Sequence, residues 1–475
     1  MSEKKPQLSG KTTKDLTVGS PAKNIVAFAL PVMLGALFQL GYSWADAIIA
    51  SEFISSEAFT AIGATAPIIF LFFSLTVGFM TGAAVVLGQF FGSKDIQNLR
   101  KAQTTILICM FVVCGVIMVA GYFLTEPLLQ LLNVEEEIIG MSAAAYLKIY
   151  FLGIVTMALY NVFAQTLHAV GNSRVPLYAL MVSTLTNIGL DLLFISVWNW
   201  GIEGAAVATI IAQGVSAAIL FAYIQIKVPV LRLKRLEFLF SKVLFKKVIK
   251  IAFPSMMQQI CAAVGFIVVS MLINKHGVDF TACFTVVNRI DEIQFVTITS
   301  FGAALTAFAA QNKGVGDIVR IKKGFWSGMW MCGGILLFTG ALVLIFREAL
   351  VGLFIRLETS TEISVERVLE ITSQFFFVMI PSFFVVMVMF LTSGVMRGAG
   401  AAIAAMEVNI FSFAMRVAAA FLLDYYFSYY GLFFATPAAW FAGAVWAVIR
   451  YNNKKWTKVN TVVPQMSPEQ AVEQG

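Results

Sequence analysis

The sequence predicts an all-α polytopic membrane protein with twelve transmembrane helices, arranged as two six-helix lobes related by a parallel internal repeat. Composition is the first reason: of 475 residues, 59% are hydrophobic and 12% charged, and the mean hydropathy is +0.85. A soluble domain carries about twice that share of charge. Long apolar runs recur along the chain, and short motifs return in its second half. Barrel strands would instead alternate in segments of about ten residues, so the helical class is predicted.

Twelve apolar runs are the predicted membrane helices, because each is long enough to cross most of a hydrocarbon core about 30 Å thick. Their approximate bounds are 24–51, 60–88, 102–124, 141–168, 176–198, 203–226, 248–273, 280–310, 325–346, 367–395, 402–425 and 431–450. Short polar turns join most of them, so neighbouring helices should be antiparallel. The polar first residues lack the short apolar core of a cleavable signal peptide, and the first run is interpreted as a true membrane helix.

The loops between these runs alternate in charge. Both tails and the even-numbered loops are basic, with Arg100 and Lys101 after the second run and Arg397 in the tenth loop, whereas Glu52 and Glu57 mark the opposite set. Because cytoplasmic loops carry the excess of Lys and Arg, both termini should lie inside a bacterial inner (plasma) membrane. The net charge of +7 is therefore interpreted as topology and contact with membrane lipid, with no nucleic-acid partner.

The repeat appears as four pairs of matching segments. "FALPVML" resembles "IAFPSMM", "GQFFGSKDI" matches "AQNKGVGDI", "AVGNS" echoes "GAGAA", and "WGIEGAAVAT" echoes "YGLFFATPAA", with an offset of about 225 residues between the partners. Two parallel six-helix lobes facing each other across a cleft are typical of a secondary transporter. The predicted division is 1–23 cytoplasmic tail, 24–226 N-lobe, 227–247 basic linker, 248–450 C-lobe and 451–475 cytoplasmic tail.

Cysteine usage and enzyme motifs argue against a redox, metal or catalytic centre. The five cysteines lie inside apolar runs without CxxC spacing or histidine partners, and are interpreted as small packing residues. P-loop, HExxH and GxSxG motifs are absent from the sequence. We therefore expect no enzyme activity, no cofactor and no resident metal, apart from a coupling ion.

Two acids inside apolar runs are the strongest functional signal. Asp46 lies in "YSWADAIIA" and Asp191 in "TLTNIGLDLLFI", and an acid at the centre of a bilayer costs about 2.5–3.5 kcal/mol on insertion scales. Thr184, Asn187 and Asp191 have i, i+3, i+7 spacing and should share one helix face. Counted from the start of its run, Asp191 lies about 22 Å along the helix, in the outer half of the first lobe.

A second polar stripe accompanies Asp46, with Gln39 and Tyr42 at i−7 and i−4. Two carboxylates close together in a low dielectric cannot both ionise cheaply, so the pair should share a proton or hold Na⁺ among oxygen ligands. Either arrangement can couple transport to an ion gradient. The alternative is a pair of helix-packing polar residues satisfied by hydrogen bonds.

The chain resembles the multidrug and toxic compound extrusion (MATE) family of the MOP flippase superfamily over residues 20–455. The matching segments are "ALPVMLGALFQLGYSWADAIIA", "GQFFGSKDIQNLRKA", "HAVGNSRVPLYALMVSTLTNIGLDLLFI" and "GIEGAAVATIIAQ". The resemblance implies a secondary active antiporter that exports amphipathic, often cationic drugs in exchange for H⁺ or Na⁺.

The same resemblance implies the site residues. The family's helix-one aspartate falls on Asp46, and the N-lobe cation site falls on Asn187, Asp191 and Thr209, with less secure matches at two helix-four positions, Tyr146 and Asn161. One Na⁺-coupled branch has a further acid in helix seven, where this chain has Ala262. Coupling is therefore expected at the N-lobe pair, and any Na⁺ at Asp46, Asn187, Asp191 and Thr209.

The C-lobe has charges whose roles the sequence leaves open. Arg289, Asp291 and Glu292 lie in "NRIDEIQ", where Arg289 and Glu292 at i, i+3 could neutralise each other. They are interpreted as structural or gating residues. Glu407 and Arg416, in the eleventh run, have the same open status.

The predicted substrate cleft lies between the first helices of the two lobes. Its lining is predicted to be Met33, Phe38, Gln39, Tyr42, Met256, Met257, Gln258 and Gln259. Thioethers and aromatic rings adapt to varied apolar shapes and attract cations. Pro31 and Pro254 occupy equivalent points of the two helices and are expected to kink them.

Two other transporter classes were weighed against the drug antiporter. A flippase of lipid-linked precursors shares the architecture but needs a strongly cationic cavity, and few Lys or Arg lie deep in these runs. A major facilitator carrier would have a GxxxDRxGRR-type loop, where this chain has "GQFFGSKDIQNLR". The expected partners are amphipathic small-molecule drugs and membrane lipid, and the expected state is a monomer.

Overall fold

The computed structural model describes residues 12–53, 56–131, 143–233, 240–276, 278–358 and 365–460, and its elements are all helices. The α-helices are α1 Pro21–Phe53, α2 Ser56–Gly92, α3 Ile96–Leu131, α5 Ala144–Ala169, α6 Arg174–Asp191, α7 Gly201–Lys227, α8 Lys242–Asn274, α9 Val278–Gly314, α10 Ile318–Ile345, α11 Arg347–Glu358, α12 Val365–Gly398, α13 Ala402–Phe427 and α14 Tyr429–Asn452. A π-helix (η2, Leu192–Val197) and two 3₁₀ turns (η3, Pro229–Leu231; η5, Lys455–Lys458) complete the described elements.

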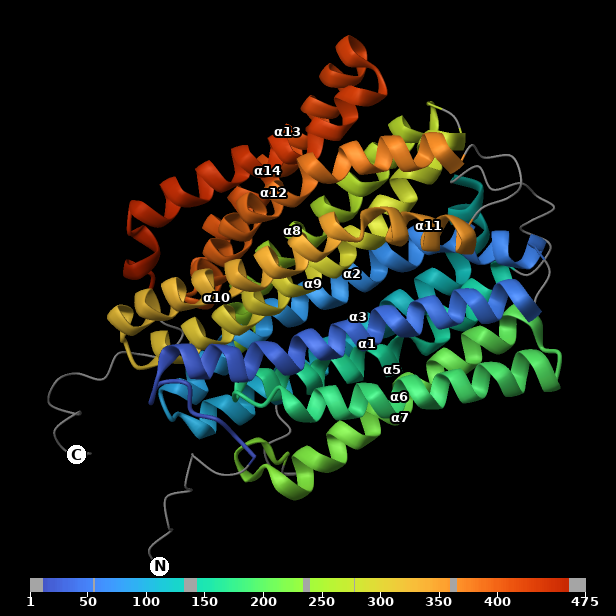
Figure 1. Cartoon of the computed structure of the whole chain (residues 1–475). Coiled ribbons are helices and arrows are strands. Elements are labelled where there is room, and N and C mark those ends of the chain that lie inside the picture. Colours follow the sequence, from blue (N-terminus) through green and yellow to red (C-terminus); the bar gives the residue numbers. More distant parts are fainter. Residues whose placement is uncertain are drawn as a thin grey trace, which may run out of the picture.

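The fold class predicted from the sequence is confirmed. The described residues contain 12 helices that are long and apolar enough to cross a membrane. Helices α5 to α7 lie on one side of the bundle and α12 to α14 on the other, while α1, α2, α8 and α9 lie between them (Figure 1). The start of α1 and the end of α14 lie at the same end of the bundle, called here the termini end (Figure 1).

The helices extend beyond the apolar runs, which corrects several predicted boundaries. Arg100 and Lys101, assigned to a loop, lie in α3, and Arg397, assigned to the tenth loop, lies in the last turn of α12. Hydropathy detects only the part of a helix immersed in lipid, whereas caps decide where it starts. Ser241 caps α8 by accepting a hydrogen bond from the Leu244 amide at 3.3 Å, so this helix already begins inside the predicted linker.

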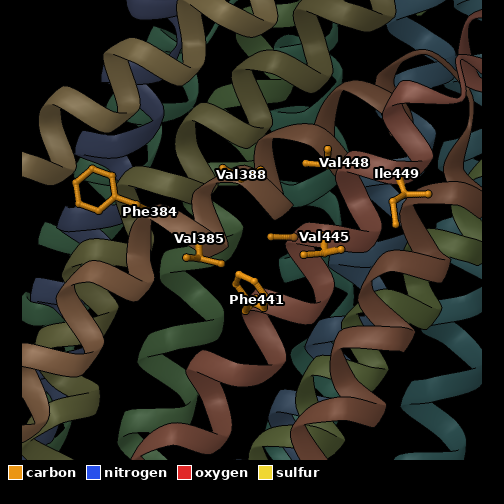
Figure 2. Close-up of a pocket in the computed structure, with 8 residues that line it drawn as sticks. Phe384, Val385, Val388, Phe441, Val445, Val448 and Ile449 are labelled. Carbon is orange, nitrogen blue, oxygen red and sulfur yellow. The ribbon is translucent and has the colours of Figure 1, made fainter.

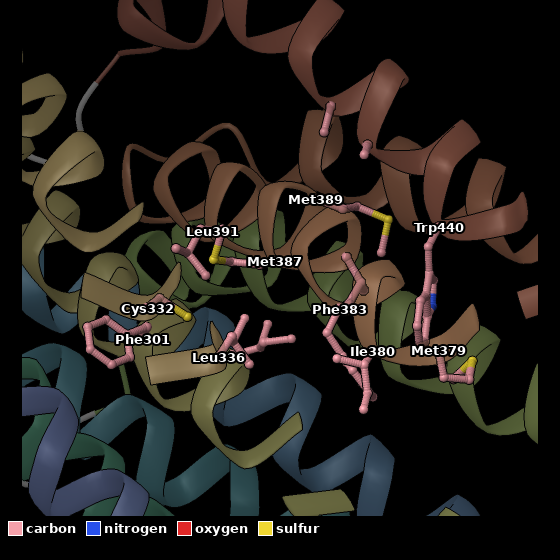
Figure 3. Packing of buried hydrophobic residues seen from close by; sticks show 14 of the residues in the cluster. Phe301, Cys332, Leu336, Met379, Ile380, Phe383, Met387, Met389, Leu391 and Trp440 are labelled. Carbon is pink, nitrogen blue, oxygen red and sulfur yellow. The ribbon is translucent and has the colours of Figure 1, made fainter. Parts of the chain in front are cut away.

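The two halves of the chain build two hydrophobic cores, and each half contributes its first helix to the core of the other. The C-half core (α8 to η5, part of it in Figure 3) includes Phe28 and Ala29 of α1, while the N-half core (α1 to η3) includes Val248 and Ala252 of α8. Because α1 and α8 are equivalent in the repeat, this exchange is reciprocal. The boundary between 24–226 and 248–450 remains a prediction, but the halves interlock at the termini end.

Small residues bring α2 and α8 into backbone contact. A Cβ on Gly78 would come within 2.6 Å of the Met256 Cα, and one on Gly82 would overlap the backbone of Ala252. Packing of this kind is favoured inside membranes, because lipid competes with side chains but not with close backbone approach. The two halves therefore touch directly along this pair of helices.

A reciprocal pair of hydrogen bonds joins the halves at the termini end. Gln89 of α2 donates from Nε2 to the Gly398 carbonyl at 3.2 Å, and Gln311 of α9 donates from Nε2 to the Ala169 carbonyl at 2.8 Å. Gln89 and Gln311 are repeat partners, as are Ala169 and Gly398. The axis of the repeat thus passes between α2 and α9.

Two glycines allow α2 and α9 to approach each other closely at this point. A Cβ on Gly92 would overlap the carbonyl oxygen of Gln311, and a Cβ on Gly314 would overlap that of Gln89. These glycines were also matched in the sequence repeat. The four residues Gln89, Gly92, Gln311 and Gly314 are called here the termini seal.

Residues 12–18, called here the N-terminal strap, cross from one half to the other at the same end. In the N-half, the Asn172 Nδ2 donates to the Thr12 carbonyl at 2.8 Å, and the Lys14 amide donates to Val170 at 3.0 Å. Leu16 is 1% exposed and sits in the C-half core. Its amide donates to the Gln311 Oε1 at 2.8 Å, which links the strap to the termini seal.

Candidate functional site

The buried polar face of α6 is the centre of the N-half site. Asn187 and Asp191 are each 1% exposed, and Ser183, one turn earlier, is 4% exposed. Their i, i+4, i+8 spacing puts all three on one face, which confirms the shared face of Asn187 and Asp191. Thr184 is only half-buried, so the third buried member is Ser183, a residue that the sequence reading missed.

Asp191 lies where the helix changes its hydrogen-bonding register. Helix α6 ends at Asp191 and continues as the π-helix Leu192–Val197. Insertions of this kind occur frequently at functional sites, because they re-aim side chains without breaking the helix. The acid therefore sits at the one irregular point of this membrane span.

Neighbouring helices fix the orientation of this face. The Ser183 hydroxyl donates to the Ala212 carbonyl of α7 at 2.7 Å, one turn after the half-buried Thr209. Helix α7 is in turn held against α5, where Gly153 leaves the space that Ile210 fills. Thr209 thus lies on the helix that directly covers the polar face of α6, and Asp191 and Thr209 both take part in polar interactions.

Helix α1 packs along α6, since Gly35 lies opposite the side chain of Leu180. Asp46 and Tyr42 belong to α1, but their side chains lie outside the described part of the structure. The structure therefore brings the helix of Asp46 against the helix of Asp191 and leaves the carboxylate of Asp46 unplaced. The contribution of Asp46 to a shared site stays a prediction.

Two further residues of the predicted site, Tyr146 and Asn161, lie on α5. Tyr146 is half-buried against the N-half core. The Asn161 Nδ2 donates to the Met157 carbonyl of its own helix at 3.0 Å, which is an ordinary use of a polar side chain in a membrane helix. Their assignment to a cation site remains untested.

The predicted cleft residues fall into two groups. Met33 and Met256, repeat partners, each pack on the opposite half: Thr297 of α9 donates to the Met33 sulfur at 3.8 Å, and Met256 packs on the N-half core. Phe38 is 42% exposed and Gln39 is also exposed, while Met257 and Gln259 are half-buried. Pro31 and Pro254 lie inside α1 and α8 as predicted, and the expected kinks remain predictions.

Gln258 differs from the other predicted cleft residues, because it is 5% exposed and faces the interior of the C-half. Its Oε1 accepts hydrogen bonds from the Arg397 Nη1 at 3.2 Å and from the Asn409 Nδ2 at 3.5 Å. It thus joins α8 to α12 and α13. Arg397 and Asn409 were not singled out from the sequence, although a search for repeat equivalents of His168 would have pointed to Arg397.

Several other charged residues of the C-half interior attract one another. Arg289 and Glu292 approach to 3.9 Å, which confirms the i, i+3 pairing expected from their spacing. Asp291 of α9 and Arg416 of α13 attract each other between the helices. Glu407 is bound by Arg450 of α14.

Two further features delimit the site. No group of three or more His, Cys, Asp or Glu that could hold a metal occurs among the described residues, and all five cysteines are free thiols.

A groove of about 410 Å³ lies between α12 and α14 (Figure 2). Its lining is wholly apolar: Phe384, Val385, Val388, Phe441, Ala444, Val445, Val448 and Ile449. It offers no group for a charged ligand and is separate from both polar sites.

Comparison with known protein families identifies the family of this chain. The family model MatE matches the chain twice, over residues 31–193 and 254–422, which reproduces the internal repeat. The chain belongs to the MatE family. Members of this family are multidrug efflux transporters driven by an ion gradient and are not enzymes, so this member is a multi-pass membrane transporter.

Curated relatives point the same way. The chain is 29% identical over 308 residues to "Probable multidrug resistance protein YpnP" of Bacillus subtilis, covering 65% of this chain and 68% of that protein. It is 24% identical over 308 residues to "Probable multidrug resistance protein NorM" of Thermotoga maritima, covering 62% and 64% of the two chains. These names favour drug efflux over the flippase alternative.

Solved structures agree in fold. The chain superposes on a "multidrug resistance MATE family transporter of the MOP superfamily" in an outward-facing conformation with a TM-score of 0.87, at 21% identity and covering 95% of this chain and 100% of the other. A MOP superfamily transporter from Pyrococcus furiosus gives the same score and coverage at 21% identity. At this identity, the likeness establishes the MATE fold.

Proposed function

We propose that this MatE protein exports amphipathic, often cationic organic compounds in exchange for H⁺ or Na⁺, and that the coupling ion acts at Asp46, Asn187, Asp191 and Thr209. The observation that carries the proposal is the buried polar face of α6, with Asn187 and Asp191 each 1% exposed. A charged acid there costs about 2.5–3.5 kcal/mol, so it favours a bound proton or cation. Binding of the ion and of the drug would then compete through this face.

The donor set suits either ion. A carboxylate, an amide and a hydroxyl on adjoining helices supply the oxygen ligands that Na⁺ sites in transporters use. The same carboxylate, protonated, would lie in this apolar surrounding without a net charge. The choice between H⁺ and Na⁺ therefore depends on measured gradients.

Alternating access requires the two halves to separate at one end at a time. The termini seal and the strap close the termini end, so this arrangement would open elsewhere. We place the termini end in the cytoplasm on the loop charges, in a bacterial inner membrane, with the protein acting as a monomer. Ion and drug must prefer different arrangements of the halves, since a ligand with equal affinity for both shifts nothing.

The test is transport by the purified protein in proteoliposomes, with pH and Na⁺ gradients imposed separately on a fluorescent amphipathic cation. One gradient should drive export by the wild type, and Asp46→Asn and Asp191→Asn should each reduce it at least about ten-fold, because they remove the group that holds the ion. Glu203→Gln, an exposed acid at the start of α7, is the matched control and should transport normally. Wild-type coupling in both aspartate variants would refute the proposal.

A further inference from the structure

The two halves carry opposite charge at equivalent points. Ser183 of α6 donates to the Ala212 carbonyl of α7 at 2.7 Å, and Ser412 of α13 donates to the Ala439 carbonyl of α14 at 3.0 Å. The two bonds hold equivalent helix pairs, so they set the register between the repeats. One turn further on, Asn187 in the N-half is matched by Arg416 in the C-half.

Two turns after each serine, the difference between the side chains of the two halves is larger. The N-half has Asp191 there, whereas the C-half has Ala420, which is 0% exposed. The acid of the N-half therefore has no counterpart, and a base stands beside its place. The C-half keeps the scaffold of the N-half site and reverses its electrostatic character.

Charge pairing in the described C-half interior leaves Arg397 without an acidic partner. Arg289 pairs with Glu292, Arg416 is attracted by Asp291, and Arg450 binds Glu407. Arg397 is bound through Nη1 to the neutral amide oxygen of Gln258. Among the described residues, no ion pair offsets the charge of Arg397.

Donor groups in the same cluster are unused within the described structure. The Nε of Arg397 and the Nε2 of Gln258 are buried without a hydrogen-bond partner. Buried donors left without acceptors are costly, more so when they are charged. Because Arg397 and Gln258 are hydrogen-bonded to each other, an anion reaching them would satisfy both donors.

The group formed by Gln258, Arg397 and Asn409 has an apolar surface beside it. Arg397, Asn409 and Arg416 are all partly exposed, although their helices form the C-half interior. Asn409, Phe413 and Arg416 follow i, i+4, i+7 spacing on α13, and the Phe413 ring lies against Gly265 of α8. An anionic group and an aromatic body would therefore find complementary partners within two turns of one helix.

We propose that Gln258, Arg397 and Asn409 bind the carboxylate of a transported amphipathic compound. The guanidinium of Arg397 and the amide of Gln258 hold the carboxylate oxygens, while Phe413 contacts the apolar body. The inference rests on the proposed transport function, and it widens the substrate class from cations to compounds that also carry an acid group. The two halves then divide the work, with the ion at the N-half and the acid group of the substrate at the C-half.

The test compares binding of rhodamine B, which has a free carboxylate, with binding of its ethyl ester to the full-length purified protein, with empty micelles as the blank. Wild type should bind the acid more tightly than the ester. Arg397→Gln should weaken binding of the acid about ten-fold, the scale of one charge-assisted hydrogen bond, and leave the ester unchanged. The affinity of Arg397→Lys for the acid should lie between those of wild type and Arg397→Gln. The control is Arg174→Gln, which replaces an exposed arginine of α6.

Asn409→Asp provides the second variant, because an acid beside Gln258 would neutralise Arg397 without removing it. It should weaken binding of the acid and spare the ester, whose retained binding also shows that the variant is folded. The proposal fails if wild type does not prefer the acid, or if neither variant separates the two dyes. Gradient-driven export of the ester, measured in parallel, reports on the proposed ion coupling independently.

Discussion

The polar faces of α6 and α13 show how one scaffold supports opposite chemistry. In α6, Ser183 is followed by a buried amide and a buried acid, whereas in α13 Ser412 is followed by an arginine and an alanine. The serine bonds to the next helix are alike in both, so the backbone framework does not decide the ligand. The difference teaches that each half keeps the fold through its small residues and hydroxyls, while one or two side chains set the charge.

The largest expected effect concerns Arg416 of α13, which Asp291 of α9 attracts in the C-half. Arg416→Asn removes this attraction from Asp291, and a buried polar group left without its partner costs about 3 kcal/mol. The double variant Asp291→Asn/Arg416→Asn should recover most of that loss. Thermal unfolding of the purified protein measures both, and equal melting temperatures for wild type and the single variant would contradict the pair.

Variants of the termini seal test whether equivalent residues of the two halves contribute equally to the closed contact. Gly92→Ala places a Cβ on the carbonyl oxygen of Gln311, and overpacking of this kind costs about 1–3 kcal/mol, or roughly ten-fold in the closed population. The repeat predicts that Gly314→Ala has the same effect through Gln89. Export should fall in both variants and stay normal in Gly115→Ala, a glycine of α3 with open space around it. A loss in one seal variant alone would break the equivalence of the halves.

The N-terminal strap distinguishes the two halves, because it makes different contacts with each of them. Arg320 of α10 donates to the Leu16 carbonyl at 3.1 Å and to the Val18 carbonyl at 2.8 Å. Arg320→Ala should release the strap by about 1.5 kcal/mol, or roughly ten-fold. Thiol labelling of a Leu16→Cys protein should then become faster by that factor, while Lys322→Ala, on the same helix, leaves the rate unchanged.

A small pH effect is expected where the strap meets the N-half. Partial burial, followed by repulsion from Arg174, holds the pKa of Lys14 below its usual value. Charging Lys14 therefore opposes docking: the penalty is complete at pH values below the lowered pKa and disappears as pH rises toward the usual value. Lys14→Met should slow labelling of Leu16→Cys at neutral pH by less than about three-fold. It should also remove the part of the alkaline pH dependence that exceeds ionisation of the thiol itself. An unchanged pH profile in the variant would contradict this account.

Much of the fold could be predicted from the sequence because lipid imposes a simple rule. Only long apolar helices satisfy their backbone in a bilayer, so the twelve runs could be found from composition, and the repeat followed from short matching motifs. Asp191 and Asn187 stood out because polar groups are rare in such runs. Contacts between helices cannot be predicted by the same rule. The packing of α1 and α8 in the core of the opposite half leaves no pattern in the sequence of either helix.

Other features were missed for specific physical reasons. Arg397 was assigned to a loop because it ends an apolar run, whereas its long side chain reaches back to Gln258. The π-helix after Asp191 depends on a shift in backbone hydrogen bonding that residue types do not specify. Ser183 was overlooked because one hydroxyl in an apolar run gives no signal until its partner on α7 is known.

The central claim is that ion coupling belongs to the N-half and not to the C-half. It is tested most directly by measuring drug export and counter-ion entry together in proteoliposomes containing wild type, Asp191→Asn or Asp291→Asn/Arg416→Asn. The account predicts that Asp191→Asn abolishes the counter-ion flux that accompanies export, while the C-half double variant keeps it. Coupled flux that survives in Asp191→Asn and disappears in the C-half variant would contradict the account.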